Sequence, residues 1–184
     1  KYIAPERKRG AVSSLVSFLC NKNDGFCSCS IKPSHEECNN IKYVFTLDAD
    51  TNMEFDCLKR AVGIMMHPQN IPVYDKEKNA VIRGYGIIQP AVVTTPSACN
   101  KNFFTSVLCG HGGVSCYQTG IVDGSMPYFG RSIFVGKGMF DKNVFYEALC
   151  ADNAFKNESV LSHDAPEGAR LRCAHVSSIT LTDS

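Results

Sequence analysis

This sequence lacks several features that would place a protein in a familiar class at once. It has no surplus of charge, because 19 Lys and Arg stand against 18 Asp and Glu, giving a formal net charge of +1. That balance argues against a general nucleic-acid binder, whose phosphate contacts require a basic surface. No run of about eighteen apolar residues occurs, so we expect no membrane-spanning helix in this segment.

The ten cysteines also lack the spacing of a zinc site. There is no CxxC pair, and Cys27 and Cys29 lie too close together for the usual paired ligands. The stretch CGHGGVSC offers three candidate ligands, Cys109, His111 and Cys116, without a fourth. A chain of this length needs no disulfide staples for folding. We therefore expect reduced, partly buried thiols.

Hydrophobic residues make up 44% of the chain and charged residues 20%, which is typical of a globular domain. We expect one domain over residues 1–184. Patterns of helix and strand alternate along it, which favours an α/β fold with a mainly parallel sheet and helices on both faces. The predicted helices are 6–20, 55–67, 97–109, 141–150 (capped by Asp141) and a short one near 164–173; the predicted strands include 41–47, two within 80–93, and 174–184. The only basic cluster, Arg7–Arg9, is expected to be a solvated first helical turn.

The stretch YVFTLDADTN places Asp48 and Asp50 one residue apart at the end of a predicted buried strand. Two such carboxylates repel each other unless a cation or a proton lies between them. Mg²⁺ and Mn²⁺ prefer carboxylate and phosphate oxygens as ligands. A DxD pair at a strand end can hold such an ion against a nucleotide-sugar diphosphate, where the ion offsets the charge on the leaving group.

Three alternatives remain open for this acidic pair. It can be a turn in which Asp50 or Thr51 caps a helix near Glu54. It can belong to a phosphohydrolase, since LDADT matches the signature of haloacid-dehalogenase-like enzymes, with Asp48 as nucleophile, Asp50 as general acid/base and Lys137 as the downstream lysine. It can also be the remnant of a site in a non-catalytic carbohydrate-binding protein.

A second acidic motif, VLSHDAPEG, lies far downstream and contains His163, Asp164 and Glu167. Inverting sugar transfer needs a base that takes the proton of the attacking hydroxyl. A carboxylate at a strand end can supply that base. The alternative is a helix cap by Ser162 or Asp164, with Glu167 completing a capping box.

Taken in order, these motifs resemble the glycosyltransferase domain of cyclic β-1,2-glucan synthases, and more widely the cellulose-synthase-like class. Those synthases are large membrane proteins that transfer glucose from UDP-glucose. The resemblance implies a GT-A-like (Rossmann-like) fold, inversion at the anomeric carbon and a β-glucan acceptor. It rests on ERKRG (6–10), YVFTLDADT (43–51), GIMMHPQNIP (63–72), GYGIIQP (84–90), FVGKGMFDKNVF (134–145) and LSHDAPEG (161–168).

The resemblance also assigns roles to individual residues. Asp48 and Asp50 would hold Mg²⁺ or Mn²⁺ and the UDP diphosphate, and Asp164 would be the catalytic base. The remaining residues that it places at the substrates are Gln89, Asp123, Gly136, Lys137, Gly138, His163 and Glu167.

The class also has an early uridine-binding strand and a tryptophan-containing element downstream, whereas this chain contains no tryptophan. We therefore expect an incomplete catalytic domain. Its partners would be the remaining domains of a larger membrane-bound synthase, and its location the cytoplasmic face of the inner membrane.

Overall fold

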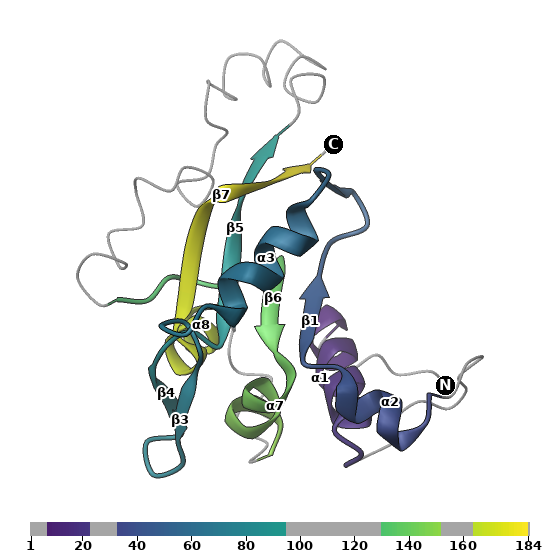
Figure 1. Cartoon of the computed structure of the whole chain (residues 1–184), viewed down its shortest axis with the longest axis vertical. Coiled ribbons are helices and arrows are strands. Elements are labelled where there is room, and N and C mark those ends of the chain that lie inside the picture. The colour runs from purple at the N-terminus through teal and green to yellow at the C-terminus, as the bar shows by residue number, and fades with distance from the viewer. Residues whose placement is uncertain (1–6, 23–32, 95–129, 152–163, 184) are drawn as a thin grey trace.

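The computed structural model describes residues 7–22, 33–94, 130–151 and 164–183, and it contains a five-stranded sheet (Figure 1). The strands lie in the order β1, β6, β5, β7, β2. Their bounds are Tyr43–Thr46 (β1), Thr51–Met53 (β2), Ile87–Thr94 (β5), Gly138–Asp141 (β6) and Cys173–Asp183 (β7). A separate hairpin joins β3 (Val73–Asp75) to β4 (Ala80–Arg83).

The sheet is mixed, so the prediction of a mainly parallel sheet is wrong for the described residues. Only β5 and β7 run parallel, whereas β1 with β6, β6 with β5 and β2 with β7 are antiparallel. Alternation of helix and strand patterns does not determine strand direction. Direction is set by pairing between distant segments, such as Tyr43 with Asp141, which a local pattern does not contain.

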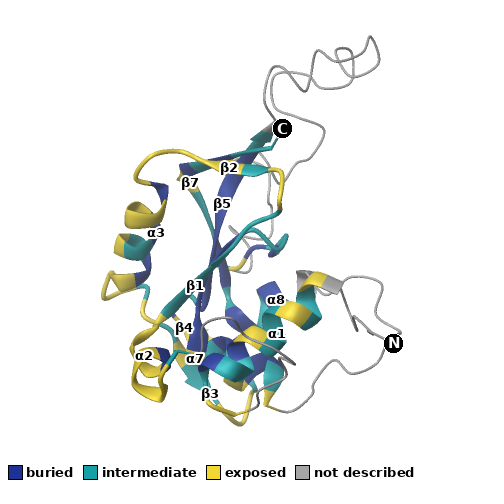
Figure 2. Cartoon of the chain, turned by 90° about the vertical axis from the view of Figure 1, so that its right-hand side faces the viewer, coloured by how far each residue is buried: buried dark blue, intermediate teal, exposed yellow. Residues whose placement is uncertain are grey.

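Helices cover both faces of this sheet, as predicted. Neighbouring residues of a strand point to opposite faces, so Ile87 and Phe140 enter one core while Ile88 and Met139 enter the other. The first core receives α1 (Arg7–Leu19), α7 (Lys142–Phe145), the π-helical turn η1 (Tyr146–Cys150) and α8 (Asp164–Leu171). The second lies beneath α3 (Cys57–Met66), whose outer side is exposed (Figure 2).

Several local predictions are confirmed. Helix α3 ends at Met66, and His67 ahead of Pro68 has an extended backbone, as the residue before a proline prefers. Asp141 caps α7, accepting hydrogen bonds from the backbone N–H groups of Asn143 and Val144 at 3.0 and 3.1 Å. The short helix α2 (His35–Asn40), which was not predicted, begins with a capping box between Ser34 and Glu37.

The cysteines that the structure describes are free thiols, as expected: Cys20, Cys38, Cys57, Cys150 and Cys173. Burial raises the pKa of Cys150 to about 11, so this thiol is a poor nucleophile at neutral pH. In the described part of the chain, no helix combines the length and the apolar character needed to cross a bilayer.

A substitution at Gly138 tests how closely β6 approaches β5. A Cβ atom at this position would lie 2.2 Å from the carbonyl oxygen of Ile88, a backbone atom that cannot move without disturbing the central strand. We expect Gly138→Ala to lower the free energy of unfolding by about 2 kcal/mol or more, measured by urea denaturation. Gly63→Ala is the matched control, because no atom lies within 4 Å of its added methyl group. That variant should gain roughly 0.5–1 kcal/mol from helix propensity, and equal effects of the two changes would contradict the close approach.

Candidate functional site

The acidic pair lies just beyond β1, in a turn closed by a 3.2 Å hydrogen bond from the Thr51 N–H to the Asp48 carbonyl. The chain then forms β2, and α3 begins only at Cys57, after Asp56 with φ +65° and no side-chain cap. The hydroxyl of Thr51 instead donates to Oδ1 of Asp183 at 2.6 Å. The prediction that Asp50 or Thr51 caps a helix near Glu54 is therefore wrong.

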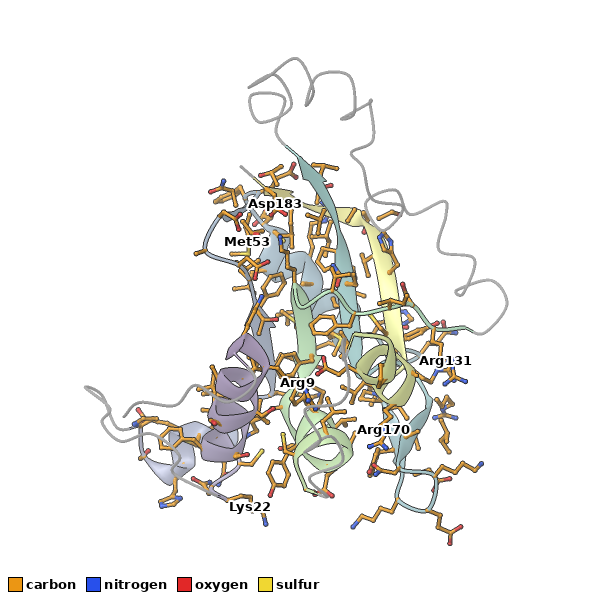
Figure 3. The ribbon with its side chains drawn as sticks, turned by 180° about the vertical axis from the view of Figure 1, so that it is seen from behind. Arg9, Lys22, Met53, Arg131, Arg170 and Asp183 are labelled. Atoms are coloured by element: carbon orange, nitrogen blue, oxygen red, sulfur yellow. The ribbon has the colours of Figure 1, made fainter. Side chains whose placement is uncertain are left out.

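Lys137 is brought directly to this turn. Its Nζ lies 3.2 Å from Oδ2 of Asp48 and 2.5 Å from Oδ2 of Asp183, at the end of β7 (Figure 3). Only 12% of the Lys137 side chain is exposed. An ammonium group shielded in this way and held by two carboxylates has a fixed position, unlike a lysine on an open surface.

Lys8 of α1 reaches the same carboxylate from the other side. Its Nζ donates to Oδ1 of Asp48 and, at 2.8 Å, to the carbonyl of Gly136. The Thr46 hydroxyl also donates to that carbonyl, at 3.2 Å. Gly136 has a φ of +80°, a conformation that glycine adopts without strain, and this turn directs both its carbonyl and Lys137 toward Asp48.

Lys8, Asp48, Lys137 and Asp183 form what we call the Asp48 cluster. The structure thus brings together four residues predicted from the sequence, namely Asp48, Gly136, Lys137 and Gly138. Sequence reasoning missed Lys8, Thr51 and Asp183 as members of the site. Of the residues at this site, only the DxD pair can be recognised from its spacing in the sequence. Asp183 reaches the site because β2 pairs with β7, which places Thr51 opposite Asp183.

The charges of the Asp48 cluster shift the pKa values of two of its members, Asp48 and Lys137. Partial burial raises the pKa of Asp48, but the hydrogen bonds from Lys8 and Lys137 outweigh it and hold the pKa below its usual range. Burial likewise lowers the pKa of Lys137, yet the bonds to Asp183 and Asp48 dominate and raise it. Both shifts favour the ionised forms of Asp48 and Lys137 near neutral pH.

The second acidic motif is connected to the cluster through α1. Nε of Arg9, the residue after Lys8, lies 2.8 Å from Oε1 of Glu167 in α8, and this pair is largely buried. Arg9 is therefore not part of a solvated helical turn, which corrects the prediction for the basic cluster. Helix α8 begins at Asp164, of which the structure describes the backbone.

The other predicted site residues do not all converge. Gln89 is buried, with Oε1 accepting from the Val135 N–H and Nε2 donating to the Pro90 carbonyl, both at 3.1 Å. The bond from Val135 ties β5 to the segment that leads into Lys137, and substrate contact by Gln89 stays a prediction. Asp123 and His163 lie outside the described residues, as do Cys109, His111 and Cys116.

The donor set at the turn fits one mode of divalent-cation binding. No group of three or more Asp, Glu, His or Cys side chains is arranged to enclose an ion in the described part of the chain. Mg²⁺ is more often held by one or two carboxylates, with water and substrate phosphate completing its shell. Asp48 and Asp50 suit that mode, provided that one Asp48 oxygen exchanges its ammonium contact for the ion.

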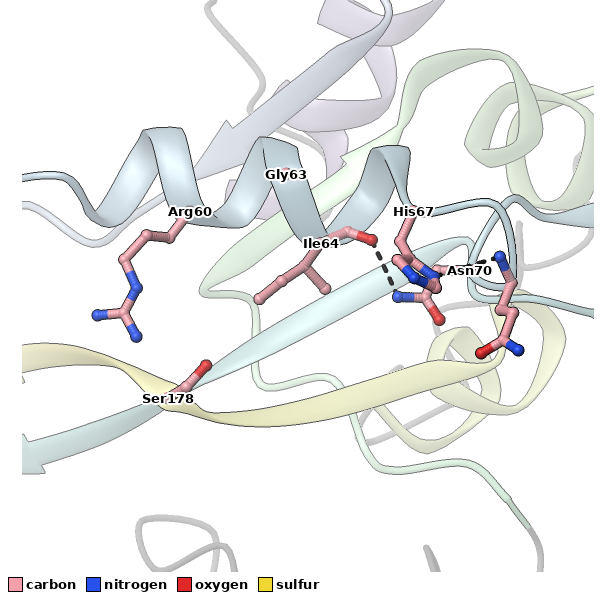
Figure 4. Close-up of a pocket in the computed structure, with 7 residues that line it drawn as sticks. Arg60, Gly63, Ile64, His67, Asn70 and Ser178 are labelled. Atoms are coloured by element: carbon pink, nitrogen blue, oxygen red, sulfur yellow. Dashed lines mark hydrogen bonds between the residues drawn. The ribbon is translucent and has the colours of Figure 1, made fainter.

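A shallow groove of about 550 Å³ lies elsewhere, between α3 and β7 (Figure 4). Asn70 donates to the Ile64 carbonyl at 2.9 Å and closes the end of α3 there. The lining residues are Arg60, Gly63, Ile64, His67, Gln69, Asn70 and Ser178. None of the predicted site residues contributes to this groove.

The fold and the site together describe a mixed α/β protein with a charged cluster at one end of its sheet. No protein-family model matches the chain. The chain is 32% identical over 181 residues to a cyclic beta-(1,2)-glucan synthase, NdvB, of Rhizobium meliloti (strain 1021). The match covers 97% of this chain and 6% of NdvB, so the chain spans a small part of that relative's length. Over its whole length the chain is therefore a homologue of one segment of a glucan synthase.

The pKa of Asp48 provides a direct test of the cluster. In Lys8→Met or Lys137→Met the carboxylate loses one of its two ammonium contacts, so its pKa should rise toward the value of a free aspartate. A ¹³C NMR titration of the side-chain carboxyl reports this. Because the folded pKa is lowered, Asp48 stabilises the native state above about pH 4, and that contribution disappears as the pH falls through the folded pKa. Lys78→Met, which removes a distant exposed lysine, should leave the Asp48 titration unchanged.

Proposed function

We propose that this chain is part of a glycosyltransferase catalytic domain that transfers glucose from UDP-glucose to a β-glucan acceptor with inversion. The observation that carries the proposal is the linkage of two acidic motifs by consecutive residues of α1. Lys8 contacts Asp48 of the DxD motif, and Arg9 contacts Glu167, three residues beyond Asp164. The homology to a glucan synthase over 97% of the chain supports the same reaction class.

In this proposal Asp48 and Asp50 bind Mg²⁺ or Mn²⁺ together with the donor's diphosphate. The ion, when bound, offsets the negative charge that develops on the leaving diphosphate. Charge supports this role, because within the Asp48 cluster Lys8 and Lys137 are already paired with Asp48 and Asp183. The cluster therefore has no surplus of positive charge to attract a diphosphate, which would need an accompanying cation.

Asp164 is proposed as the base that takes the proton from the acceptor hydroxyl as it attacks the anomeric carbon. Glu167 is engaged by Arg9 and is buried, so we give it a supporting role in orienting α8. Lys137 would stay beside the diphosphate. Gly136 and Gly138 would fix the turn that carries it, and Gln89 would brace that turn from β5. The domain would act within a larger membrane-bound synthase at the cytoplasmic face of the inner membrane.

One observation favours a second candidate, the aspartyl phosphohydrolase. Its lysine must contact the nucleophilic aspartate, and Lys137 lies 3.2 Å from Asp48. Against it, that lysine immediately precedes β6, a strand antiparallel to β1, and the chain's homology is to a glucan synthase. Phosphate release from a generic phosphomonoester, lost in Asp48→Asn, would establish this alternative instead.

Calorimetric titration of UDP-glucose with Mn²⁺ and with EDTA tests the donor site. We expect metal-dependent binding that weakens at least about tenfold in Asp48→Asn, because the ion loses a charged ligand. Asp75→Asn is the matched control, since Asp75 lies in the β3–β4 hairpin and bonds the backbone N–H groups of Glu77 and Lys78. If neither EDTA nor Asp48→Asn changed the affinity for UDP-glucose, the result would indicate a non-catalytic carbohydrate-binding protein.

The role of Asp164 is separable from donor binding. In a complete synthase, the matching Asp164→Asn change should reduce glucosyl transfer by about 100-fold or more, the usual contribution of a general base. Metal-dependent UDP binding should remain near that of the unchanged enzyme, because Asp164 is assigned no contact with the diphosphate. A variant that fails to bind UDP would contradict the assignment of Asp164 as base.

A further inference from the structure

Asp183 is a member of the Asp48 cluster that belongs to no recognisable sequence motif. Each of its two carboxylate oxygens makes a contact. Oδ1 accepts from the Thr51 hydroxyl at 2.6 Å, and Oδ2 contacts Lys137 Nζ at 2.5 Å. The backbones of Thr51 and Asp183 are already paired in the sheet. The bond from Thr51 therefore repeats a pairing that the backbones of β2 and β7 already make, whereas the contact with Lys137 joins β7 to the turn before β6.

The effect of that contact is to cancel charge where the proposed function needs a cation. Without Asp183, the Lys137 ammonium would face Asp48 alone and neutralise the carboxylate intended for the ion. With Asp183 beside it, Lys137 adds no net charge at the turn. The negative charge of Asp48 then remains for the ion once Lys8, which has 41% of its side chain exposed, exchanges its contact with Asp48.

We propose that Asp183 is a positioning residue that holds Lys137 against Asp48 and cancels its charge, so that the DxD turn retains affinity for a divalent cation. This inference rests on the proposed function and extends it by one residue. Asp183 does not touch the ion or the sugar. It acts through Lys137, which also keeps one ammonium group beside the position assigned to the diphosphate.

A double-mutant cycle on the 184-residue chain tests this arrangement, with Mn²⁺ binding followed by electron paramagnetic resonance. Asp183→Asn adds one unit of positive charge near the ion and should weaken Mn²⁺ binding roughly tenfold. Lys137→Met removes one unit and should strengthen binding by a similar factor. The double variant restores the balance, so its Mn²⁺ affinity should return to within about threefold of the unchanged chain.

Two controls carry the same charge changes at a distance. Asp75→Asn and Lys78→Met lie in the β3–β4 hairpin and should leave Mn²⁺ affinity unchanged. A second readout needs no metal: the pKa of Lys137, followed by NMR of its side chain, should fall in Asp183→Asn, because the bond from Asp183 is the larger of the contacts that raise it. If Asp183 only stabilised the fold, Asp183→Asn would change neither the Mn²⁺ affinity nor the pKa of Lys137 more than the control variants do.

The outcomes separate this inference from the proposed function. If Asp48→Asn abolishes Mn²⁺ binding while Asp183→Asn behaves like Asp75→Asn, the inference is overturned and the metal site stands. If Asp48→Asn leaves Mn²⁺ binding unchanged, the proposed metal site is wrong. The inference about cation affinity is then overturned together with the metal site, whatever the pKa of Lys137 does in Asp183→Asn.

Discussion

The site depends on one shielded ammonium group, that of Lys137, held between carboxylates from the ends of β1 and β7. Those strands are not neighbours, because β6 and β5 lie between them in the sheet. The lysine therefore joins the ends of two strands, β1 and β7, that no backbone hydrogen bonds join directly. The turn before β6 makes this possible: Gly136 reverses the chain at positive φ, and Gly138 lets it pass within contact of Ile88. If Gly136 lost its positive φ, or if the chain at Gly138 moved away from Ile88, Lys137 would move away from Asp48 and Asp183.

Helix α1 adds a second constraint through two consecutive basic residues. Its apolar residues Val12 and Val16, and Cys20 directly after its end, pack in the first core, which orients its first turn toward the Asp48 cluster. There Lys8 and Arg9 diverge to Asp48 and Glu167. A buried Arg–Glu pair is costly to break because either partner alone would leave a desolvated charge. The position of α8, and with it the start of the second acidic motif, is thereby coupled to the turn that carries the first.

Local chemistry allowed much of this to be predicted from the sequence. Helical periodicity located α1 and α3, Asp141 indicated the cap of α7, and the DxD spacing drew attention to Asp48, around which the structure gathers Lys8 and Lys137. Strand direction was not predictable, since Val44 meets Phe140 and Ile87 meets Cys173 through long-range pairing alone. Asp183 was missed for the same reason. It sits in an ordinary polar strand end, and only the fold reveals that its carboxylate meets Lys137. The burial of Arg9 likewise depends on a partner far away in the sequence.

The two lysines that contact Asp48 differ in a way that assigns them different roles. Both satisfy the carboxylate and lower its pKa, yet 41% of the Lys8 side chain is exposed against 12% for Lys137. An exposed ammonium recovers most of its hydration when it leaves, so exchanging it for a divalent ion costs little. Displacing Lys137 would instead strand Asp183 without its counter-charge. The exchangeable contact is therefore Lys8, whose bond to the Gly136 carbonyl gives it a second anchor. In the metal site that we propose, the ion would therefore enter on the Lys8 side of Asp48, while the contact with Lys137 remains in place.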